Sequence, residues 1–211
     1  LYYVEVEEPL LESPSGDLER LLDALRDDWG LSGLTVDTSL LSGLQARLRE
    51  GRWSVTVAVR EASEVVAIWP GLRETVLGVA VDVGSTTLAA HLCDLSSGEV
   101  LASSGVMNPQ IRFGEDLMSR VSHIMLQPDS RPEMTRVVQE AVNQLVVALT
   151  EETGLSSEDI LEIVLVGNPI MHHLLVGISP VELGMAPFAL ATDAALSFSA
   201  QDLGLALHPG A

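Results

Sequence analysis

A continuous apolar run that ends in a polar turn constrains the fold of this chain most. Residues 76–81 are all apolar or glycine, the run Asp82-Val83-Gly84-Ser85-Thr86-Thr87 follows, and residues 87–94 again resemble a strand. An apolar run of this kind predicts a strand with both faces covered. The glycine lets the backbone approach a phosphate, and the consecutive amides and hydroxyls after it can donate hydrogen bonds to phosphate oxygens. The pattern predicts a strand, a phosphate-binding turn and a second strand.

Asp82 stands at the end of the predicted buried strand. A carboxylate there can hold hydrated Mg²⁺, which prefers oxygen ligands and tends to keep several waters. The alternative is an ordinary hairpin in which Gly84 serves a tight turn and the hydroxyls only cap it, and spacing alone leaves this alternative open. The turn is neither a Walker A loop nor a dinucleotide-binding Gly-x-Gly-x-x-Gly loop, so those two classes are set aside.

The segments that follow predict a mixed α/β domain over residues 75–211. Residues 99–107 supply a third strand after the turn at Ser96-Ser97-Gly98, which makes an antiparallel meander. We expect a helix that starts near Gly114-Glu115-Asp116, a long helix over residues 131–153 and a parallel central strand over residues 160–166. After residue 183 we expect mostly loop, apart from a short helix at residues 200–203.

Residues 1–74 predict a separate small α/β unit. Two amphipathic helices are expected over residues 18–29, capped by Ser15 or Asp17, and from about residue 38 to Gly51. The second buries a set of leucines, namely Leu40, Leu41, Leu44 and Leu48. Strands are expected within residues 1–8, 53–60 and 64–69, with residues 9–16 as a linker or turn.

Composition excludes several classes of function. The 211 residues carry 30 acidic and 11 basic side chains, a formal charge of −19 that would repel a phosphate backbone, so we expect no nucleic-acid partner. No apolar stretch is long enough to span a membrane, and no export signal is recognisable, so we expect a cytoplasmic protein. Cys93 is the one cysteine, so these residues cannot hold an iron–sulfur cluster of the all-cysteine type.

Three runs of the sequence carry a family resemblance: residues 79–94, the run Asn108-Pro109-Gln110-Ile111-Arg112-Phe113-Gly114-Glu115-Asp116, and residues 166–175. They resemble the reductive activators of corrinoid proteins. That family has a ferredoxin-type domain, a linker, a small middle domain and an ATPase domain of the actin and hexokinase type. The resemblance covers nearly the whole chain. It implies a linker and small α/β middle domain over residues 1–74, followed by a truncated first lobe of an actin-like (ribonuclease H-like) ATPase with a mixed sheet.

The resemblance also implies a function. Such a protein uses ATP to return an inactive cob(II)alamin carrier to cob(I)alamin, with a corrinoid protein as partner and electrons from an iron–sulfur cluster upstream of these residues. It implies a homodimer through residues 1–74. Asp82 would position Mg²⁺, and the residues implied to bind the ATP cofactor are Asp82, Gly84, Ser85, Thr86, Thr87, Gly167 and Asn168. No catalytic residue is assigned.

Other readings stay open. Pro169-Ile170 stands where the family pattern leads us to expect two threonines, and the second phosphate loop of the family is absent from these residues. A small-molecule kinase of the same superfamily and a non-catalytic dimerisation or docking fragment are the alternative functions. His172 and His173 suggest a metal or corrinoid ligand, although adjacent histidines more often pack or face solvent. Arg112 could contact an acidic patch of a partner or pair with Glu115 or Asp116, and we expect the local pair. We expect Cys93 to be a packing residue rather than a nucleophile.

Overall fold

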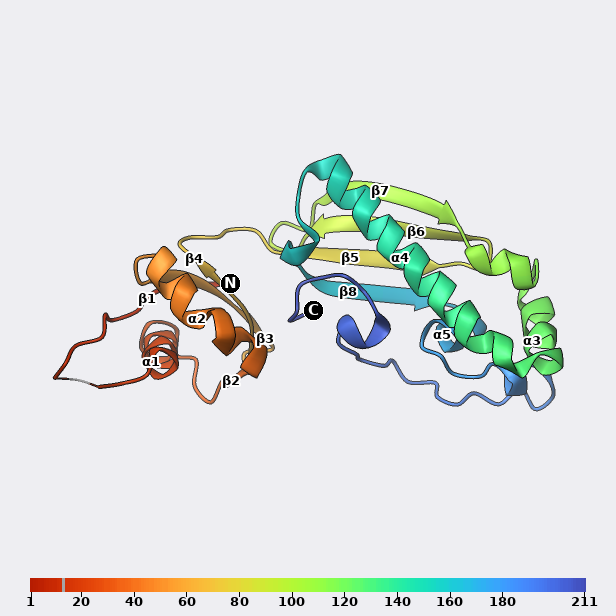
Figure 1. The fold of residues 1–211 in the computed structure, drawn as a ribbon, viewed down its shortest axis with the longest axis horizontal. Coiled ribbons are helices and arrows are strands. Elements are labelled where there is room, and N and C mark those ends of the chain that lie inside the picture. The colour runs from red at the N-terminus through yellow and green to blue at the C-terminus, as the bar shows by residue number, and fades with distance from the viewer. Residues whose placement is uncertain (13) are drawn as a thin grey trace. The chain divides into compact units, whose positions relative to one another are not determined.

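Two hydrophobic cores form in the computed structural model, which describes residues 1–12 and 14–211. The chain divides between Val76 and Leu77 (Figure 1), two residues after the predicted end of the first domain at residue 74. The predicted linker at residues 9–16 includes Ser13, which lies outside the described residues.

The first unit is a four-stranded sheet with two helices. Its strands have the order β1-β3-β4-β2, with β2 parallel to β4 and the other pairs antiparallel. The helices bury leucines such as Leu21, Leu44 and Leu48 against valines of the sheet. The elements are β1 (Tyr2–Glu5), α1 (Asp17–Trp29), β2 (Thr35–Val36), α2 (Thr38–Glu50), β3 (Ser54–Arg60) and β4 (Glu64–Pro70).

Two details of this unit differ from the expectation. Gly16 is the N-cap of α1, and none of the described side chains caps this helix, because the Asp17 carboxylate pairs instead with Arg20 and with Arg49, the latter at 2.7 Å. Leu41 is 39% exposed, since it lies about 100° around the helix from the buried row of Leu40, Leu44 and Leu48. Asp37 caps α2 by accepting from the Ser39 N–H.

The second unit is a mixed sheet in the order β7-β6-β5-β8, with β5, β6 and β7 antiparallel and β8 parallel to β5. The meander and the helix–strand order after it are therefore confirmed. The elements are β5 (Leu77–Val83), β6 (Thr87–Asp94), β7 (Val100–Met107), α3 (Leu117–Leu126), α4 (Arg131–Thr153), β8 (Ile160–Gly167), α5 (Pro169–Leu175) and 3₁₀ turns η1 (Pro109–Phe113), η2 (Pro128–Ser130), η3 (Ser157–Asp159), η4 (Val181–Gly184) and η5 (Gln201–Leu203).

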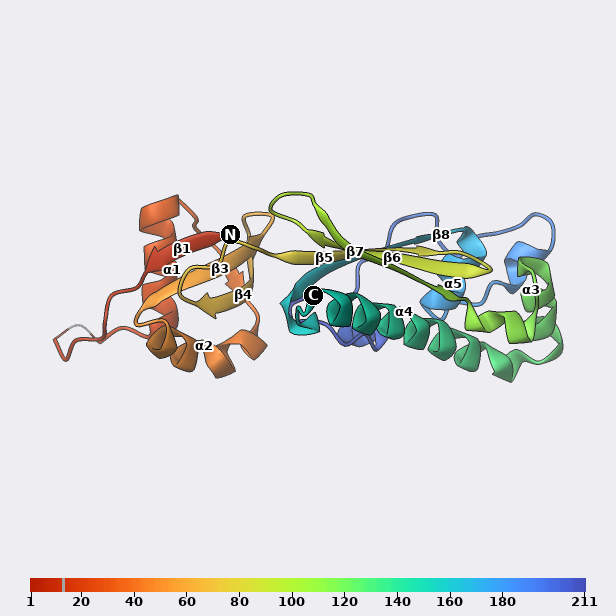
Figure 2. The same cartoon turned by 90° about the horizontal axis from the view of Figure 1, so that it is seen from above.

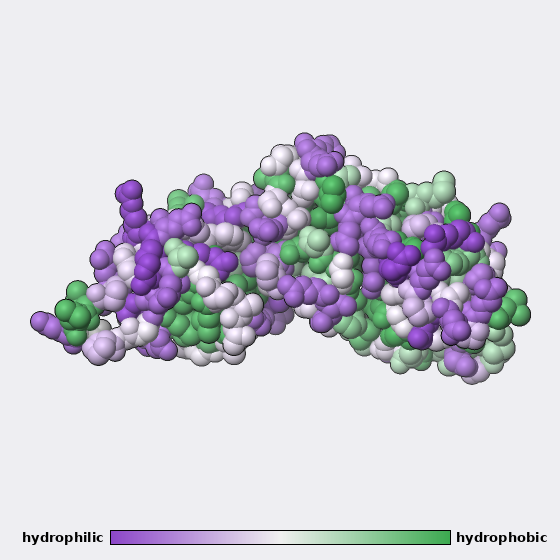
Figure 3. Space-filling view, in the orientation of Figure 1, coloured by the Kyte–Doolittle hydropathy of each residue, from purple (hydrophilic) through white to green (hydrophobic). Residues whose placement is uncertain are grey.

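Helix α4 covers one face of this sheet, as Figures 1 and 2 show. Hydrophilic residues predominate on the side of α4 that faces the viewer in Figure 3. The buried residues of the helix recur at helical spacing and are Met134, Val137, Val138, Ala141, Val142, Leu145, Val146 and Leu149. The core between α4 and the sheet also contains side chains from the C-terminal segment, including Ala200, Leu205 and Leu207.

The face of the sheet away from α4 is largely exposed, and β8 lies at its edge. These two observations correct two predictions. Strand β5 is covered on both faces only over its first half, because Ala80 and Asp82 are exposed. Strand β8 was expected to be central but is an edge strand, and its Val164 and Val166 are 52% and 57% exposed. Hydrophobic periodicity reports burial of a segment and not the order of strands in a sheet, so it could not distinguish these cases.

Candidate functional site

The candidate site lies where the parallel strands β5 and β8 both end. In the register of the sheet, Asp82 is beside Val166 and Val83 is beside Gly167. The loop after β5 and the turn after β8 therefore emerge at the same edge, the position at which ligands bind in open α/β sheets. The structure thus brings the two predicted groups of site residues together, Asp82 to Thr87 from one strand end and Gly167 with Asn168 from the other.

The loop between β5 and β6 consists of Gly84, Ser85 and Thr86. A Cβ atom on Gly84 would lie 2.4 Å from the carbonyl oxygen of Thr87, so the tight return of the chain requires glycine here. Ser85 is half-buried, while Thr86 and Thr87 are exposed. Within residues 1–12 and 14–211, no hydrogen bond is donated by the N–H groups of Ser85 and Thr86 or by the hydroxyls of Ser85, Thr86 and Thr87.

Asp82 points away from the hydrophobic core. Its neighbours in β5, Val81 and Val83, are each 1% exposed and pack in the core, whereas Asp82 is exposed on the open face of the sheet. Its carboxylate makes no ion pair or hydrogen bond with the described residues. A free carboxylate beside a loop with free donors suits a hydrated Mg²⁺ ion that accompanies a phosphate.

Gly167 and Asn168 form the other side of the site. A Cβ atom on Gly167 would lie 3.0 Å from the carbonyl oxygen of Val83, so this glycine allows the two strand ends to approach closely. The side-chain oxygen of Asn168 caps α5 by accepting from the Met171 N–H at 3.0 Å. Pro169 occupies the first turn of α5 and has no N–H to donate, so this side offers fewer donors than the loop after β5.

A buried polar network lies beneath the loop, and its residues come from parts of the chain too far apart for the sequence to indicate the network. Asn108, Gln110 and Arg120 are each 0% exposed. Asn108 donates from Nδ2 to the Gly84 carbonyl at 2.8 Å and from its backbone N–H to the Thr86 carbonyl at 2.8 Å. Arg120 donates from Nη2 to the Ser85 carbonyl. The three consecutive carbonyls of the loop are therefore all occupied by inner residues.

Arg120 is held without a carboxylate partner. Its Nε donates to the Gly114 carbonyl at 3.0 Å, and its Nη1 lies 3.4 Å from Oε1 of Gln110 and 3.3 Å from Sδ of Met171. Among the described residues, no carboxylate forms an ion pair with it. Burial lowers the pKa of the Arg120 guanidinium and the Asp116 carboxylate raises it by less, yet a guanidinium stays protonated in proteins.

The remaining predicted residues have structural contacts. His173 is buried, with Nδ1 2.7 Å from the Pro169 carbonyl and Nε2 accepting from the Ala191 N–H at 3.2 Å. No group of three or more potential metal ligands occurs in the described part of the chain. Arg112 pairs with Glu133 at 2.6 Å, and the expected pair with Glu115 or Asp116 was wrong because Asp116 caps α3 through the Ser119 N–H. Cys93 is half-buried in β6.

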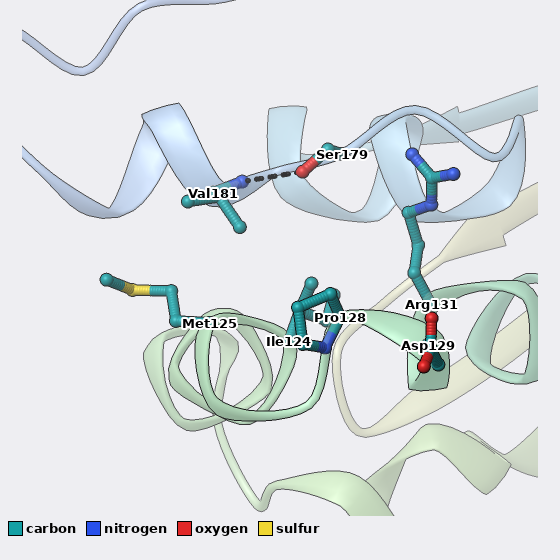
Figure 4. Close-up of a pocket in the computed structure, with 7 residues that line it drawn as sticks. All are labelled: Ile124, Met125, Pro128, Asp129, Arg131, Ser179 and Val181. Atoms are coloured by element: carbon teal, nitrogen blue, oxygen red, sulfur yellow. Dashed lines mark hydrogen bonds between the residues drawn. The ribbon is translucent and has the colours of Figure 1, made fainter.

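A pocket of about 540 Å³ lies elsewhere in the second unit (Figure 4). Side chains of α3 face Ser179 and Val181 across it, and none of the predicted site residues lines it. We therefore place the candidate site at the strand ends and not in this pocket.

Among the helices that the structure describes, none combines the length and the hydropathy that a membrane-spanning segment needs.

Comparisons with known proteins agree with this fold. Residues 1–75 match the family model described as the RACo linker region, and residues 77–211 match the RACo middle region. The corrinoid activation enzyme RamQ of Eubacterium limosum is 30% identical over 137 residues, which are 65% of this chain and 23% of RamQ. A solved structure of a reductive activator for corrinoid, iron–sulfur protein matches with a TM-score of 0.83 and 30% identity, over 99% of this chain and 34% of that chain.

The match confirms the α/β fold class, a small α/β unit followed by an actin-like lobe with a mixed sheet. This chain spans about a quarter to a third of the relatives that it matches. The family models assign the middle region to residues 77–211 and the linker region to residues 1–75, whereas the resemblance had led us to expect the middle domain within residues 1–74. The chain belongs to the RACo family, with its linker region at residues 1–75 and its middle region at residues 77–211.

Proposed function

We propose that this chain is part of an ATP-dependent reductive activator, which returns an inactive cob(II)alamin protein to the cob(I)alamin state. The names of RamQ and of the solved activator support corrinoid activation as the general function. The observation that supports a nucleotide is the loop after β5. Among the described residues, its N–H groups and hydroxyls have no acceptor, and Asp82 at the end of the same strand has no partner.

In this proposal the loop binds the phosphates of ATP. Ser85 and Thr86 donate their N–H groups, and the hydroxyls of Ser85, Thr86 and Thr87 add further donors. Asp82 orients the waters of a Mg²⁺ ion, while Gly167 with Asn168 bounds the site from the end of β8. When bound, ATP with Mg²⁺ supplies the free energy of phosphate hydrolysis. The loop after β5 fits this role because its N–H groups and hydroxyls, like the Asp82 carboxylate, have no partner among the described residues.

The electron source lies outside these residues. One cysteine, Cys93, cannot hold an iron–sulfur cluster, and its Sγ lies 3.9 Å from the backbone carbonyl of His91 in the middle of a sheet. A corrinoid protein as partner, a cytoplasmic location and a homodimer through residues 1–74 complete the proposal, and the dimer rests on the family resemblance alone.

The test compares Asp82→Ala with Asp94→Asn in the full-length protein. Asp94 pairs in register with Leu77 at the start of β5, so its carboxylate lies at the other end of the same strands. We expect Asp82→Ala to abolish Mg²⁺-dependent ATP hydrolysis and corrinoid reduction, followed by absorbance, while circular dichroism stays native. Asp94→Asn should keep both activities. Normal hydrolysis by Asp82→Ala would remove the metal assignment, and ATP-dependent phosphorylation of a small molecule would favour a kinase.

A further inference from the structure

The loop after β5 has an inner side, where its carbonyl groups meet buried side chains, and an outer side, where its N–H groups have no acceptor among the described residues. Three consecutive carbonyls, those of Gly84, Ser85 and Thr86, accept hydrogen bonds from Asn108 and Arg120. Both donors are completely buried. They come from positions 24 and 35 residues away in the sequence, so the contact is made by the tertiary fold and not by the local turn.

Because the peptide bond is planar, fixing the direction of a carbonyl group also fixes the direction of the N–H group that follows it. In a trans peptide, the C=O of one residue and the N–H of the next point in opposite directions. When Asn108 holds the Gly84 carbonyl inward, the N–H of Ser85 must point outward. When Arg120 holds the Ser85 carbonyl inward, the N–H of Thr86 must point outward. These are the two N–H groups that have no acceptor among the described residues.

The charge of Arg120 gives the contact a second consequence. A buried charge that has no ion-pair partner is costly to desolvate. Arg120 directs its donors to carbonyl, amide and thioether acceptors, all of them neutral. A hydrogen bond from a cation to the Ser85 carbonyl polarises that peptide and strengthens its N–H as a donor. An anion on the outer side of the loop would also balance the guanidinium through the loop.

We propose that Asn108 and Arg120 are positioning residues that turn the loop amides outward, and that Arg120 makes the loop selective for a highly charged polyphosphate. The proposal rests on the nucleotide site proposed above. Neither residue touches the ligand. Both act through the peptide groups of Gly84, Ser85 and Thr86, and we call the pair the carbonyl clamp.

The first measurement needs no ligand. In the full-length protein, Arg120→Met or Asn108→Ala removes a clamp donor. Amide hydrogen exchange should then rise in peptides that cover residues 82–88, because the paired ends of β5 and β6, where Val83 lies opposite Leu88, lose the fixed loop that joins them. Arg136→Met is the matched control, because it makes the same chemical change on the exposed surface of α4, where Arg136 pairs with Glu140. Unchanged exchange of residues 82–88 in folded clamp variants would overturn the positioning role, whether or not the protein binds ATP.

The second measurement separates charge from shape. We expect Arg120→Met to weaken MgATP binding about tenfold or more in calorimetric titration, the scale of a lost hydrogen bond to a charged group, with adenosine affinity unchanged. Arg120→Lys should recover part of the MgATP affinity, because it keeps the charge but not the fork of donors. Equal losses for MgATP and adenosine would overturn the selectivity.

The two proposals fail in different ways. If the unaltered protein does not bind MgATP, the proposed function fails, and the exchange measurement still decides whether the clamp holds the loop. If Arg120→Met does not fold, Arg120→Lys and Asn108→Ala are judged by the same two criteria. Wild-type exchange and wild-type MgATP affinity in these variants would overturn the clamp.

Discussion

At the residue scale, Gly84 is fixed by the space around it. A Cβ atom would lie 2.4 Å from the Thr87 carbonyl oxygen, which is backbone and cannot rotate away. We expect Gly84→Ala to shift the loop, to lower the free energy of unfolding by about 1–3 kcal/mol and to weaken MgATP binding in the full-length protein. Chemical denaturation and calorimetric titration measure the two effects.

A neighbouring glycine supplies the control for this prediction. Gly105 lies in β7 beside Ala89 of β6, and a Cβ there would lie 3.5 Å from the Leu88 carbonyl oxygen, an ordinary contact. Gly105→Ala should therefore leave both stability and MgATP affinity close to wild type. If the two alanine variants behave alike, the close approach at Gly84 is not what shapes the loop.

Single residues also show what the sequence could predict about the site. The stretch from Asp82 to Thr87 is continuous, so its strand end and its donors could be recognised from the sequence alone. Asn108 and Arg120 could not be assigned, because their partners lie 24 and 35 positions away and a buried arginine has no periodic signature. The predicted ion pair of Arg112 was wrong for the same reason, because its partner Glu133 is 21 residues away.

At the element scale, α3 depends on its cap. Asp116 accepts from the Ser119 N–H, and this backbone hydrogen bond holds the pKa of the Asp116 carboxyl below its ordinary value. The folded state therefore gains stability from the carboxylate above pH about 4, the ordinary aspartate range, and loses it as the pH falls through the lower pKa of the folded state. Asp116→Asn keeps an oxygen to cap the helix but loses this dependence.

The expected result is a pH-dependent difference in stability. Asp116→Asn should be less stable than wild type at pH about 7, and the difference should shrink as the pH falls below about 4. Urea unfolding at a series of pH values measures it. Asp193→Asn removes a carboxylate in the loop before η5 that caps no helix among the described elements, so it controls for net charge. A difference that stays constant with pH would contradict the role of the charged cap.

The elements differ in how well a single sequence predicts them. Helix α4 has the predicted bounds because its apolar residues recur at helical spacing over six turns and Gly154 ends it. Strand β2 has two residues and no pattern, so it was missed. The edge position of β8 was also missed, because its apolar sequence suits a central strand and the neighbours of a strand are set by tertiary pairing.

At the scale of the whole molecule, each unit has a hydrophobic core of its own. The first core is built from residues 4–68 and the second from residues 77–207, with no residue in common. Separate cores are what allow a segment to fold by itself. The candidate site, its loop and the carbonyl clamp all belong to the second unit.

We therefore expect residues 77–211 to fold without residues 1–76 and to unfold in one cooperative transition in urea. Within this piece, Leu145→Ala should lower the free energy of unfolding by about 2–5 kcal/mol, since Leu145 lies on the buried side of α4, in the core between the helix and the sheet. Val147→Ala on the same helix, 52% exposed, should cost little. A piece that unfolds without a cooperative transition, or equal losses for both variants, would show that the second core needs the first unit.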